Sequence, residues 1–254
     1  MRKTVLYGVL ACCLVVLNSC LGDPATQLTM ANQAGVVSIT GRTPDKIIYV
    51  KGGEIISSEE FQQANVEDGE CILFDYSIDY GAAENTDEGA NIGYKIATIY
   101  ENTISEVRQW DMLNTLTDTS TVNPNELLLT SLQARSAYIR GNLFLFAEMS
   151  NHQTNQRDSF SLSYNPNQLL GDDPIYSLYL RTILTSSDTT RGQSMIIPCA
   201  FNIEDFVNEA ARKTGTDEVK FRINYANAFG KDSLNVTWKS SDVFTVNRSE
   251  RVTE

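Results

Sequence analysis

Alternation of apolar and polar residues with a period of two is the feature that most restricts what this chain can fold into. The clearest apolar sets are Phe160/Leu162/Tyr164, Val219/Phe221/Ile223/Tyr225 and Leu234/Val236/Trp238. These sets predict antiparallel strands with one buried face, because successive side chains of a strand point to opposite sides. Residues 143–146 and 175–184 are apolar on both faces, which favours central strands. The chain is therefore expected to be all-β.

One segment predicts a short α-helix instead. Asn202 can cap this helix, and Glu204 and Asp205 would stabilise its positive end. Its apolar stripe consists of Phe206, Val207, Ala210 and Ala211. Gly215 is expected to end the helix, and Ser58 is expected to start a shorter helical turn nearer the N-terminus.

Strand candidates and a polar stretch suggest two domains. Strands are expected near residues 36–42, 46–51, 71–80 and 92–100, enough for a small β barrel or sheet. The Thr- and Asn-rich stretch 114–125 then predicts a domain boundary. The rest offers about seven strand candidates and one crossover helix, which fits a β-sandwich. We expect an N-terminal β domain at 35–120 and a C-terminal β-sandwich at 121–250; a single long sandwich is the alternative.

The N-terminus has the order of a signal peptide. Arg2 and Lys3 precede an apolar run from residue 5 to 17, which is too short to span a bilayer. The following Leu17-Asn18-Ser19-Cys20 resembles the bacterial lipobox, in which the cysteine becomes the first mature residue and carries a diacylglyceryl group. We therefore expect a signal peptide at 1–19, lipid on Cys20 and a tether at 20–34. An ordinary secretory peptide, with Cys20 present by chance, is the alternative.

Charge and cysteine content narrow the function. The chain has 20 Lys+Arg against 32 Asp+Glu and a net charge of −12, so a nucleic-acid partner is not expected. No later stretch reaches the 18 apolar residues of a membrane span. Cys12 and Cys13 would leave with the signal peptide, so Cys71 and Cys199 remain beside Cys20. Both lie in apolar runs and are expected to be buried thiols; a disulfide between them is the alternative.

Taken together, these features resemble the NigD-like lipoproteins of the Bacteroides group. The stretches that carry the resemblance are 69–76, 111–113 through 141–144, 219–225, 229–231 and the strand that ends at Trp238. The resemblance implies an OB-like N-terminal barrel, a C-terminal β-sandwich and anchoring to the outer membrane of a Gram-negative cell. It supplies no agreed activity and leaves the periplasmic or surface side open.

The chain departs from that family in two places. Arg181 is followed by Thr182-Ile183, where family members often have His-Asn. Only Asp23 is acidic just after Cys20, where members often carry an acidic run that is linked to surface display. Surface display is therefore not implied for this chain.

His152 is the only histidine, and it limits the catalytic chemistry available. A two-histidine zinc site cannot form, and no metal or other cofactor is expected. His152 lies in a polar stretch and is expected to be a solvated loop residue. No G-x-S-x-G motif is present, because the stretch 192–196 fails at its last position. Pairing of His152 with a Cys199 nucleophile would need an exposed thiol, whereas Cys199 is expected to be buried.

Acidic and aromatic residues supply the other candidates. Asp75 and Asp79 would lie about 13 Å apart on one strand, beyond the roughly 5–9.5 Å used by glycoside hydrolases. Glu84, Asp87 and Glu88 lack the EF-hand spacing and are expected to form a solvated loop, with a calcium site as the alternative. Large aromatic residues could bind a sugar or a peptide. Trp238 is expected in the core, whereas Trp110 is left open between the core and a binding surface.

The function expected from the sequence is a non-enzymatic binding or assembly module, held on the bilayer by acylated Cys20. Its protein or glycan partner is not identified, and no catalytic residue is assigned. A hydrolase that uses carboxylates on envelope or dietary glycans is the alternative. A bacteriocin-linked immunity role ranks third, because it rests on the family name alone.

Overall fold

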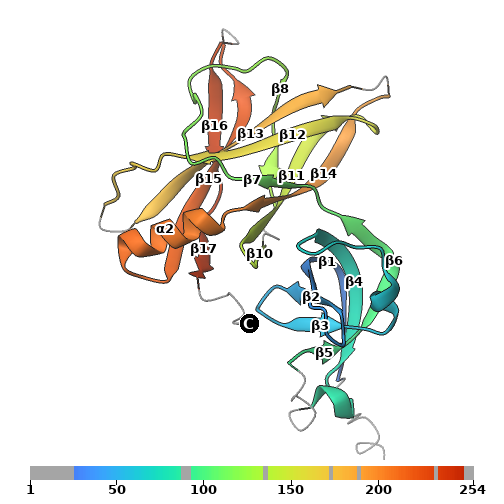
Figure 1. Ribbon diagram of the computed structural model, residues 1–254. Coiled ribbons are helices and arrows are strands. Elements are labelled where there is room, and N and C mark those ends of the chain that lie inside the picture. The colour runs from blue at the N-terminus through green and yellow to red at the C-terminus, as the bar shows by residue number, and fades with distance from the viewer. Residues whose placement is uncertain are drawn as a thin grey trace, which may run out of the picture.

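The computed structural model describes residues 26–86, 93–133, 137–171, 174–187, 190–231 and 234–248. Within these ranges the chain forms strands in three sheets, one α-helix and two short 3-10 helices (Figure 1). The predicted all-β fold is therefore confirmed. The predicted signal peptide and the predicted lipidation site Cys20 lie outside the described residues.

The N-terminal strands form a closed barrel. They are β1 (Gln27–Ile39), β2 (Lys46–Val50), β3 (Ile55–Ser57), β4 (Cys71–Asp79), β5 (Lys95–Ile96) and β6 (Thr98–Glu106). Their order is β5-β3-β2-β1-β4-β6. Because only Ala97 separates β5 from β6, the two ends of this order are neighbouring parts of one chain segment and the sheet closes. The barrel interior is apolar, with Ile48, Ile72 and Phe74 fully buried.

Two 3-10 helices flank the barrel: η1 (Glu60–Gln63) and η2 (Ala83–Asn85). The backbone N–H of Phe61 donates to Ser58 Oγ over 3.1 Å, so the helical turn predicted after Ser58 is confirmed. β1 begins at Gln27, inside the range 20–34 that the sequence predicts as a tether. Most residues in the first half of this strand are exposed, so no apolar alternation reveals it.

The C-terminal strands form two sheets. The first sheet contains β7 (Gln109–Asp111), β9 (Ser131–Leu132), β10 (Ala137–Ile139), β11 (Asn142–His152) and β14 (Gln193–Asn202). The second contains β8 (Glu126–Leu127), β12 (Arg157–Tyr164), β13 (Ile175–Ser186), β15 (Glu218–Phe229), β16 (Val236–Ser240) and β17 (Phe244–Asn247). We call this pair of sheets the two-sheet unit.

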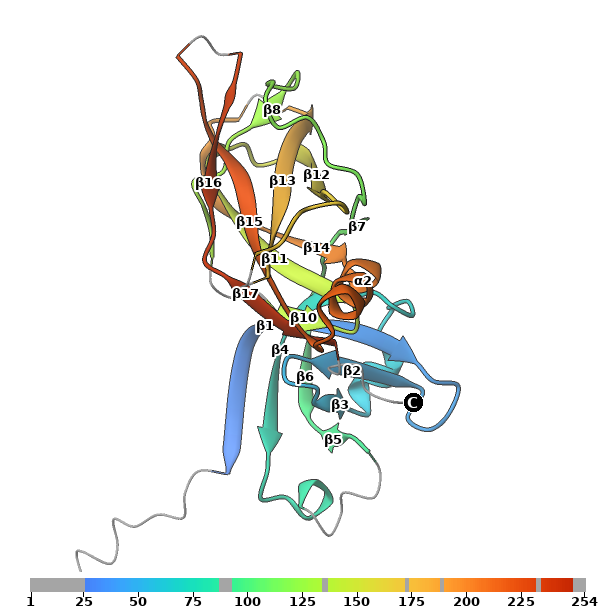
Figure 2. The ribbon, with the colours of Figure 1, turned by 90° about the vertical axis from the view of Figure 1, so that its left-hand side faces the viewer.

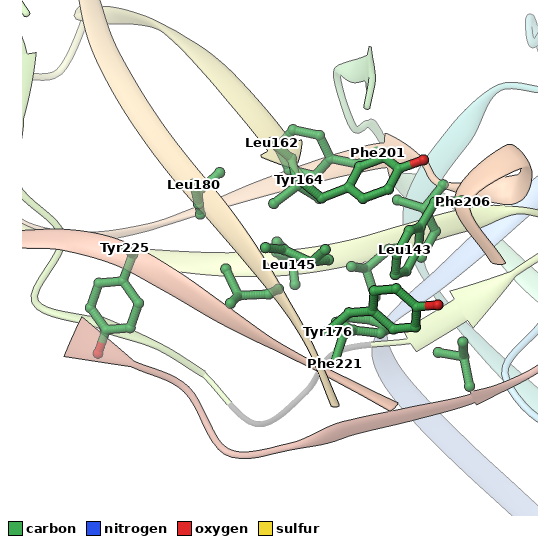
Figure 3. Packing of buried hydrophobic residues seen from close by; sticks show 14 of the residues in the cluster. Leu143, Leu145, Leu162, Tyr164, Tyr176, Leu180, Phe201, Phe206, Phe221 and Tyr225 are labelled. Atoms are coloured by element: carbon green, nitrogen blue, oxygen red, sulfur yellow. The ribbon is translucent and has the colours of Figure 1, made fainter. Parts of the chain in front are cut away.

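One apolar core joins these two sheets. Figure 3 shows Leu145 and Phe201 of the first sheet and Leu180 and Phe221 of the second sheet sharing this core. The predicted alternating sets in β12 and β15 are buried throughout, as expected. The third set is not: Leu234 is 68% exposed.

The helix α2 (Glu204–Thr214) connects β14 to β15 and confirms the predicted helix. Asn202 Oδ1 accepts the N–H of Glu204 over 3.1 Å, and Gly215 ends the helix with φ +70°. The crossover lets β15 run parallel to β13. The antiparallel arrangement predicted for β15 therefore holds for its pairing with β16 and β17 and is wrong for β13.

The barrel packs on the outer face of the first sheet of the two-sheet unit (Figure 2). Phe144 and Phe146 of β11 meet Val36 and Leu73 of the barrel in a continuous apolar cluster. This contact explains why residues 143–146 are apolar on both faces: Leu143 and Leu145 fill the core between the sheets. Cys71 lies in the cluster between the units, so its thiol shares the apolar surroundings of the interface.

The stretch 114–125 lies within the two-sheet unit and not between the two units. β7, which precedes it, pairs with β14, and β8, which follows it, pairs with β13. The chain therefore passes from the barrel to the two-sheet unit between β6 and β7. The structure differs here from the predicted ranges 35–120 and 121–250, because this polar stretch crosses from one sheet of the unit to the other.

Candidate functional site

A cavity of about 310 Å³ opens on the outside of the barrel. It lies where η1, η2, the end of β4 and the bend between β5 and β6 come together. Its lining includes four carboxylates, Glu59, Glu60, Asp79 and Glu84, and no lysine or arginine. We call this the acidic cavity; its negative charge would attract a cationic ligand.

Asn85 fixes one wall of the acidic cavity. Its side-chain amide donates to the carbonyls of Asp79 (3.0 Å) and Ile96 (2.8 Å), and its Oδ1 accepts the N–H of Ile96 (2.7 Å). Lys95 Nζ donates to the Asn85 carbonyl over 2.6 Å. These bonds hold η2 against β5, so the position of Glu84 follows from the barrel.

Hydrogen bonds set the charge state of Asp79. Bonds from the Thr26 side chain and from the N–H of Gly81 lower the pKa of this carboxyl below its ordinary value of 3.8. The Gly81 bond is 2.9 Å long. Asp79 is therefore ionised at neutral pH and is unsuited to donate a proton. Ionised Asp79 favours the binding of a cationic group and leaves Glu59, Glu60 and Glu84 as the other carboxylates that line the cavity.

A second group of polar side chains lies on the face of β13 that points away from the core between the sheets. Arg181 of β13 donates through Nη1 to Glu126 Oε2 over 2.7 Å, and the two side chains are 2% and 0% exposed. The guanidinium also lies over the Trp238 ring, 5.3 Å from its centroid. The side chains of Arg181 and Glu126 are enclosed by the protein, so their contacts act on the structure around them.

Cys199 and His152 do not form a nucleophile pair, which the expected burial of Cys199 already argued against. Cys199 is fully buried and contacts the carbonyl of Leu145, with Sγ 3.7 Å from the oxygen. Burial raises the pKa of Cys71 to about 12 and also raises that of Cys199. Both thiols are free, which confirms the prediction of two buried and unbridged cysteines.

The prediction of a solvated His152 is wrong. His152 is 5% exposed at the end of β11, and its Nε2 lies 3.0 Å from Asp158 Oδ2. A β-bulge between Met149 and His152 carries the strand through the polar residues that the sequence suggested were a turn. Ser194, from the incomplete nucleophile motif, is exposed on β14. The sequence assigned no catalytic residue, and the side-chain partner of His152 is Asp158.

Of the acidic residues considered from the sequence, Asp79 and Glu84 both line the acidic cavity, whereas Asp75 does not. Asp75 accepts the N–H of Asn32 over 2.6 Å, whereas Asp79 lines the acidic cavity. Glu84 lies on η2, and Asp87 and Glu88 fall outside the described residues. Among the residues that the structure describes, no three His, Cys, Asp or Glu side chains form a group able to hold a metal ion.

The two tryptophans differ from the expectation that Trp238 is the one in the core. Trp238 is half-buried on the outer face of the second sheet, because it pairs with Ala226 while core-facing Tyr225 pairs with Lys239. The core position predicted for it is therefore wrong. Trp110 packs against the core through Phe160 and Phe201, at centroid distances of 5.3 and 5.9 Å.

Sequence reasoning missed the Arg181–Glu126 pair and the residues Glu59 and Glu60. The signal for Arg181 was present: a single charged residue inside the apolar run 175–184 implies a buried partner. Glu126 gave no comparable signal, because it follows a polar stretch. Within the described ranges, no helix combines the length and apolarity that a membrane span needs.

Comparison with known proteins gives a family for the barrel and a fold for the whole described chain. A family model described as the lipoprotein OB domain matches residues 25–104. No curated protein matches the chain. Three similar solved structures come from Bacteroides and Parabacteroides, and all three are below 25% identity, so the likeness is one of fold.

The first is an uncharacterized protein from Parabacteroides merdae, with TM-score 0.74, 21% identity and coverage of 87% of this chain and 99% of that one. A candidate lipoprotein from Bacteroides fragilis has TM-score 0.56, 11% identity and coverage of 87% and 98%. A NigD-like immunity protein from Bacteroides caccae has TM-score 0.50, 10% identity and coverage of 87% and 97%. Residues 25–104 thus match the lipoprotein OB domain, and the chain shares its fold with proteins from Bacteroides and Parabacteroides that include a NigD-like immunity protein, as the resemblance implied.

Proposed function

We propose that this protein is held on the outer membrane of a Gram-negative cell by acyl chains on Cys20 and acts as a non-enzymatic binding or assembly module. The observation that carries the proposal is the lipobox-like Leu17–Cys20 directly ahead of a lipoprotein OB domain. Two or more acyl chains hold a protein stably on a bilayer, because each buried CH₂ contributes about 0.8 kcal/mol.

The start of β1 supports a barrel that stands close to the membrane. Only residues 21–26 separate Cys20 from Gln27. An extended chain covers at most about 3.3–3.6 Å per residue, so the barrel lies within about 25 Å of the acylated cysteine. The barrel is then the unit that follows the membrane anchor directly.

The anchor is tested by labelling cells with an alkyne fatty acid and comparing Cys20→Ala with Cys13→Ala. The matched control removes a cysteine that leaves with the signal peptide. We expect Cys13→Ala to be labelled and processed like the wild type, and Cys20→Ala to stay an unlabelled precursor. Normal processing and labelling of Cys20→Ala would refute the anchor.

Protease treatment of intact cells, with a periplasmic lipoprotein as control, then decides the side of the membrane. Degradation of this chain alone would place its body on the surface and favour capture of a glycan or protein from outside. Protection would place it in the periplasm and favour an assembly partner, to be sought by crosslinking.

The acidic cavity favours one alternative, a carboxylate hydrolase that acts on envelope or dietary glycans. Glu59, Glu60 and Glu84 are its candidate residues, since Asp79 favours the ionised form. The test is release of reducing ends from such glycans by the purified mature protein. Activity that disappears in Glu84→Gln or Glu59→Gln would replace the binding proposal.

The fold likeness to a NigD-like immunity protein favours an immunity role as a further alternative. Expression of the chain in a bacteriocin-sensitive strain tests it directly. Survival that requires Cys20 would support immunity at the membrane.

A further inference from the structure

Residues 114–125, which we call the strap, cross the outer face of the second sheet without joining it as a strand. Backbone bonding fastens the strap at two points: the N–H of Val122 donates to the carbonyl of Leu234 (3.1 Å), and the N–H of Leu184 on β13 donates to the carbonyl of Asn125 at the end of the strap (2.9 Å). Two side-chain bonds add to it: Trp238 Nε1 donates to the Thr119 carbonyl (2.8 Å), and the Thr117 and Ser163 hydroxyls lie 3.1 Å apart. Every strap residue is exposed or half-buried, so little apolar burial holds the strap closed.

Arg181 supplies the strongest fastening. Its Nη2 donates to the carbonyls of Asp118 and Thr121, the latter over 2.9 Å, while Nη1 pairs with Glu126. Glu126 Oε2 in turn accepts the N–H of Asn123 over 2.8 Å. One buried guanidinium therefore joins the middle of the strap to its end.

This fastening is incompletely satisfied. Arg181 Nε and Glu126 Oε1 are buried and have no hydrogen-bond partner. Buried ions regain their lost hydration only when their remaining donors and acceptors are bonded. Opening of the strap would hydrate both atoms, which offsets part of the loss of the closed contacts.

Hydrogen bonds within the strap would let it move as one unit. The Asp118 carboxylate accepts the N–H and Oγ of Ser120 (2.8 and 2.6 Å) and Oγ1 of Thr121 (2.6 Å). These bonds lie within the strap and persist when it lifts. Leu178 and Leu180, the neighbours of Arg181 on β13, point into the core, so lifting the strap removes none of their contacts.

We propose that the strap is a releasable cover, closed by the Arg181–Glu126 pair, that opens while both sheets stay folded. The open state uncovers Trp238 and the ring packed against it, that of Tyr179, whose centroid is 5.2 Å away. The outer face of the second sheet is therefore covered by the strap in the closed state and presents an aromatic surface in the open state.

The test measures hydrogen exchange and tryptophan quenching in Arg181→Met, made in a Trp110→Phe background so that Trp238 is the only tryptophan. We expect strap amides, Val122 above all, to exchange about tenfold faster, with β15 and the amides of β13 other than Leu184, which is bonded to the strap, unchanged. Acrylamide should quench Trp238 more strongly. Lys213→Met, which breaks an exposed pair with Glu209, is the matched control and should change neither signal.

Two results would overturn the proposal. Unchanged exchange in the strap would show that Arg181 does not fasten it. Equal acceleration in the strap, β13 and β15 would show that the strap opens only when the sheet unfolds. If Arg181→Met does not fold, Glu126→Gln is judged by the same two criteria, because it removes the charge and keeps the side-chain shape.

Discussion

One group of acidic side chains in the barrel and one in the two-sheet unit are placed in opposite ways. In the barrel, the carboxylates of Glu59, Glu60, Asp79 and Glu84 gather around an open cavity, and the interior is apolar. In the two-sheet unit, Glu126 and Asp158 are buried and each faces a basic side chain. Carboxylates around the open cavity of the barrel are thus available to a ligand, whereas the buried carboxylates of the two-sheet unit hold other parts of the fold in place.

The largest test breaks the apolar contact that joins the regions. Phe144 is fully buried between the barrel and the first sheet of the two-sheet unit. Phe144→Ala should lower the free energy of unfolding by about 3–5 kcal/mol, because it leaves a cavity that neither unit can fill. Denaturant unfolding followed by circular dichroism measures the loss, and the two units should then unfold in separate transitions.

Leu169→Ala is the control for this prediction, because Leu169 is 96% exposed and its removal should leave the transition unchanged. A loss below about 1 kcal/mol in Phe144→Ala would contradict the shared core. The two regions would then be independent domains that merely touch.

A smaller effect is expected when a buried carboxylate of the two-sheet unit is removed. The Asp158 carboxylate accepts hydrogen bonds from His152 Nε2 (3.0 Å) and Gln156 Nε2 (2.8 Å). Asp158→Ala therefore leaves a buried histidine without its hydrogen-bond partner. We expect a loss of about 1–3 kcal/mol in urea unfolding. Glu84→Ala, the counterpart in the acidic cavity, should leave stability unchanged, because its side chain is exposed. Equal losses in both variants would erase the contrast between the regions.

These tests also separate what the sequence could predict from what it could not. The core sets in β12 and β15, the helix α2 and both buried cysteines follow from local patterns, so they were predictable. The wrong positions of His152 and Trp238 share a different cause. Each depends on which strand pairs with which, and a shift of one residue in register exchanges the two faces of a strand.

The acidic cavity was beyond prediction for a related reason. Glu59 and Glu84 are far apart in the sequence and become neighbours only because β5 pairs with β3 and Asn85 fastens η2 to β5. The strap was misread because its polar composition resembles a linker, whereas its contacts come from Arg181 and Trp238 on other strands. In both regions the missing information was long-range pairing.

The smallest expected effect concerns proton binding in the acidic cavity. The Thr26 hydroxyl helps to hold the pKa of Asp79 below 3.8, so Thr26→Val should move that pKa upward, as measured by NMR titration of the carboxyl carbon. A carboxyl whose pKa is lowered by folding adds stability at pH above its unfolded value, and this contribution disappears as the pH falls through the folded value. Thr26→Val should therefore lower the free energy of unfolding of the barrel slightly at neutral pH. In strong acid, the difference in this free energy between the variant and the wild type should become smaller. Thr29→Val, the same change on the exposed part of β1, should leave the Asp79 pKa where it is. If the pKa of Asp79 is the same in the two variants, the Thr26 bond does not lower it. The backbone N–H of Gly81 would then be the bond that holds the Asp79 carboxylate ionised, so the fold would fix the charge of this open carboxylate as it fixes that of the buried ones.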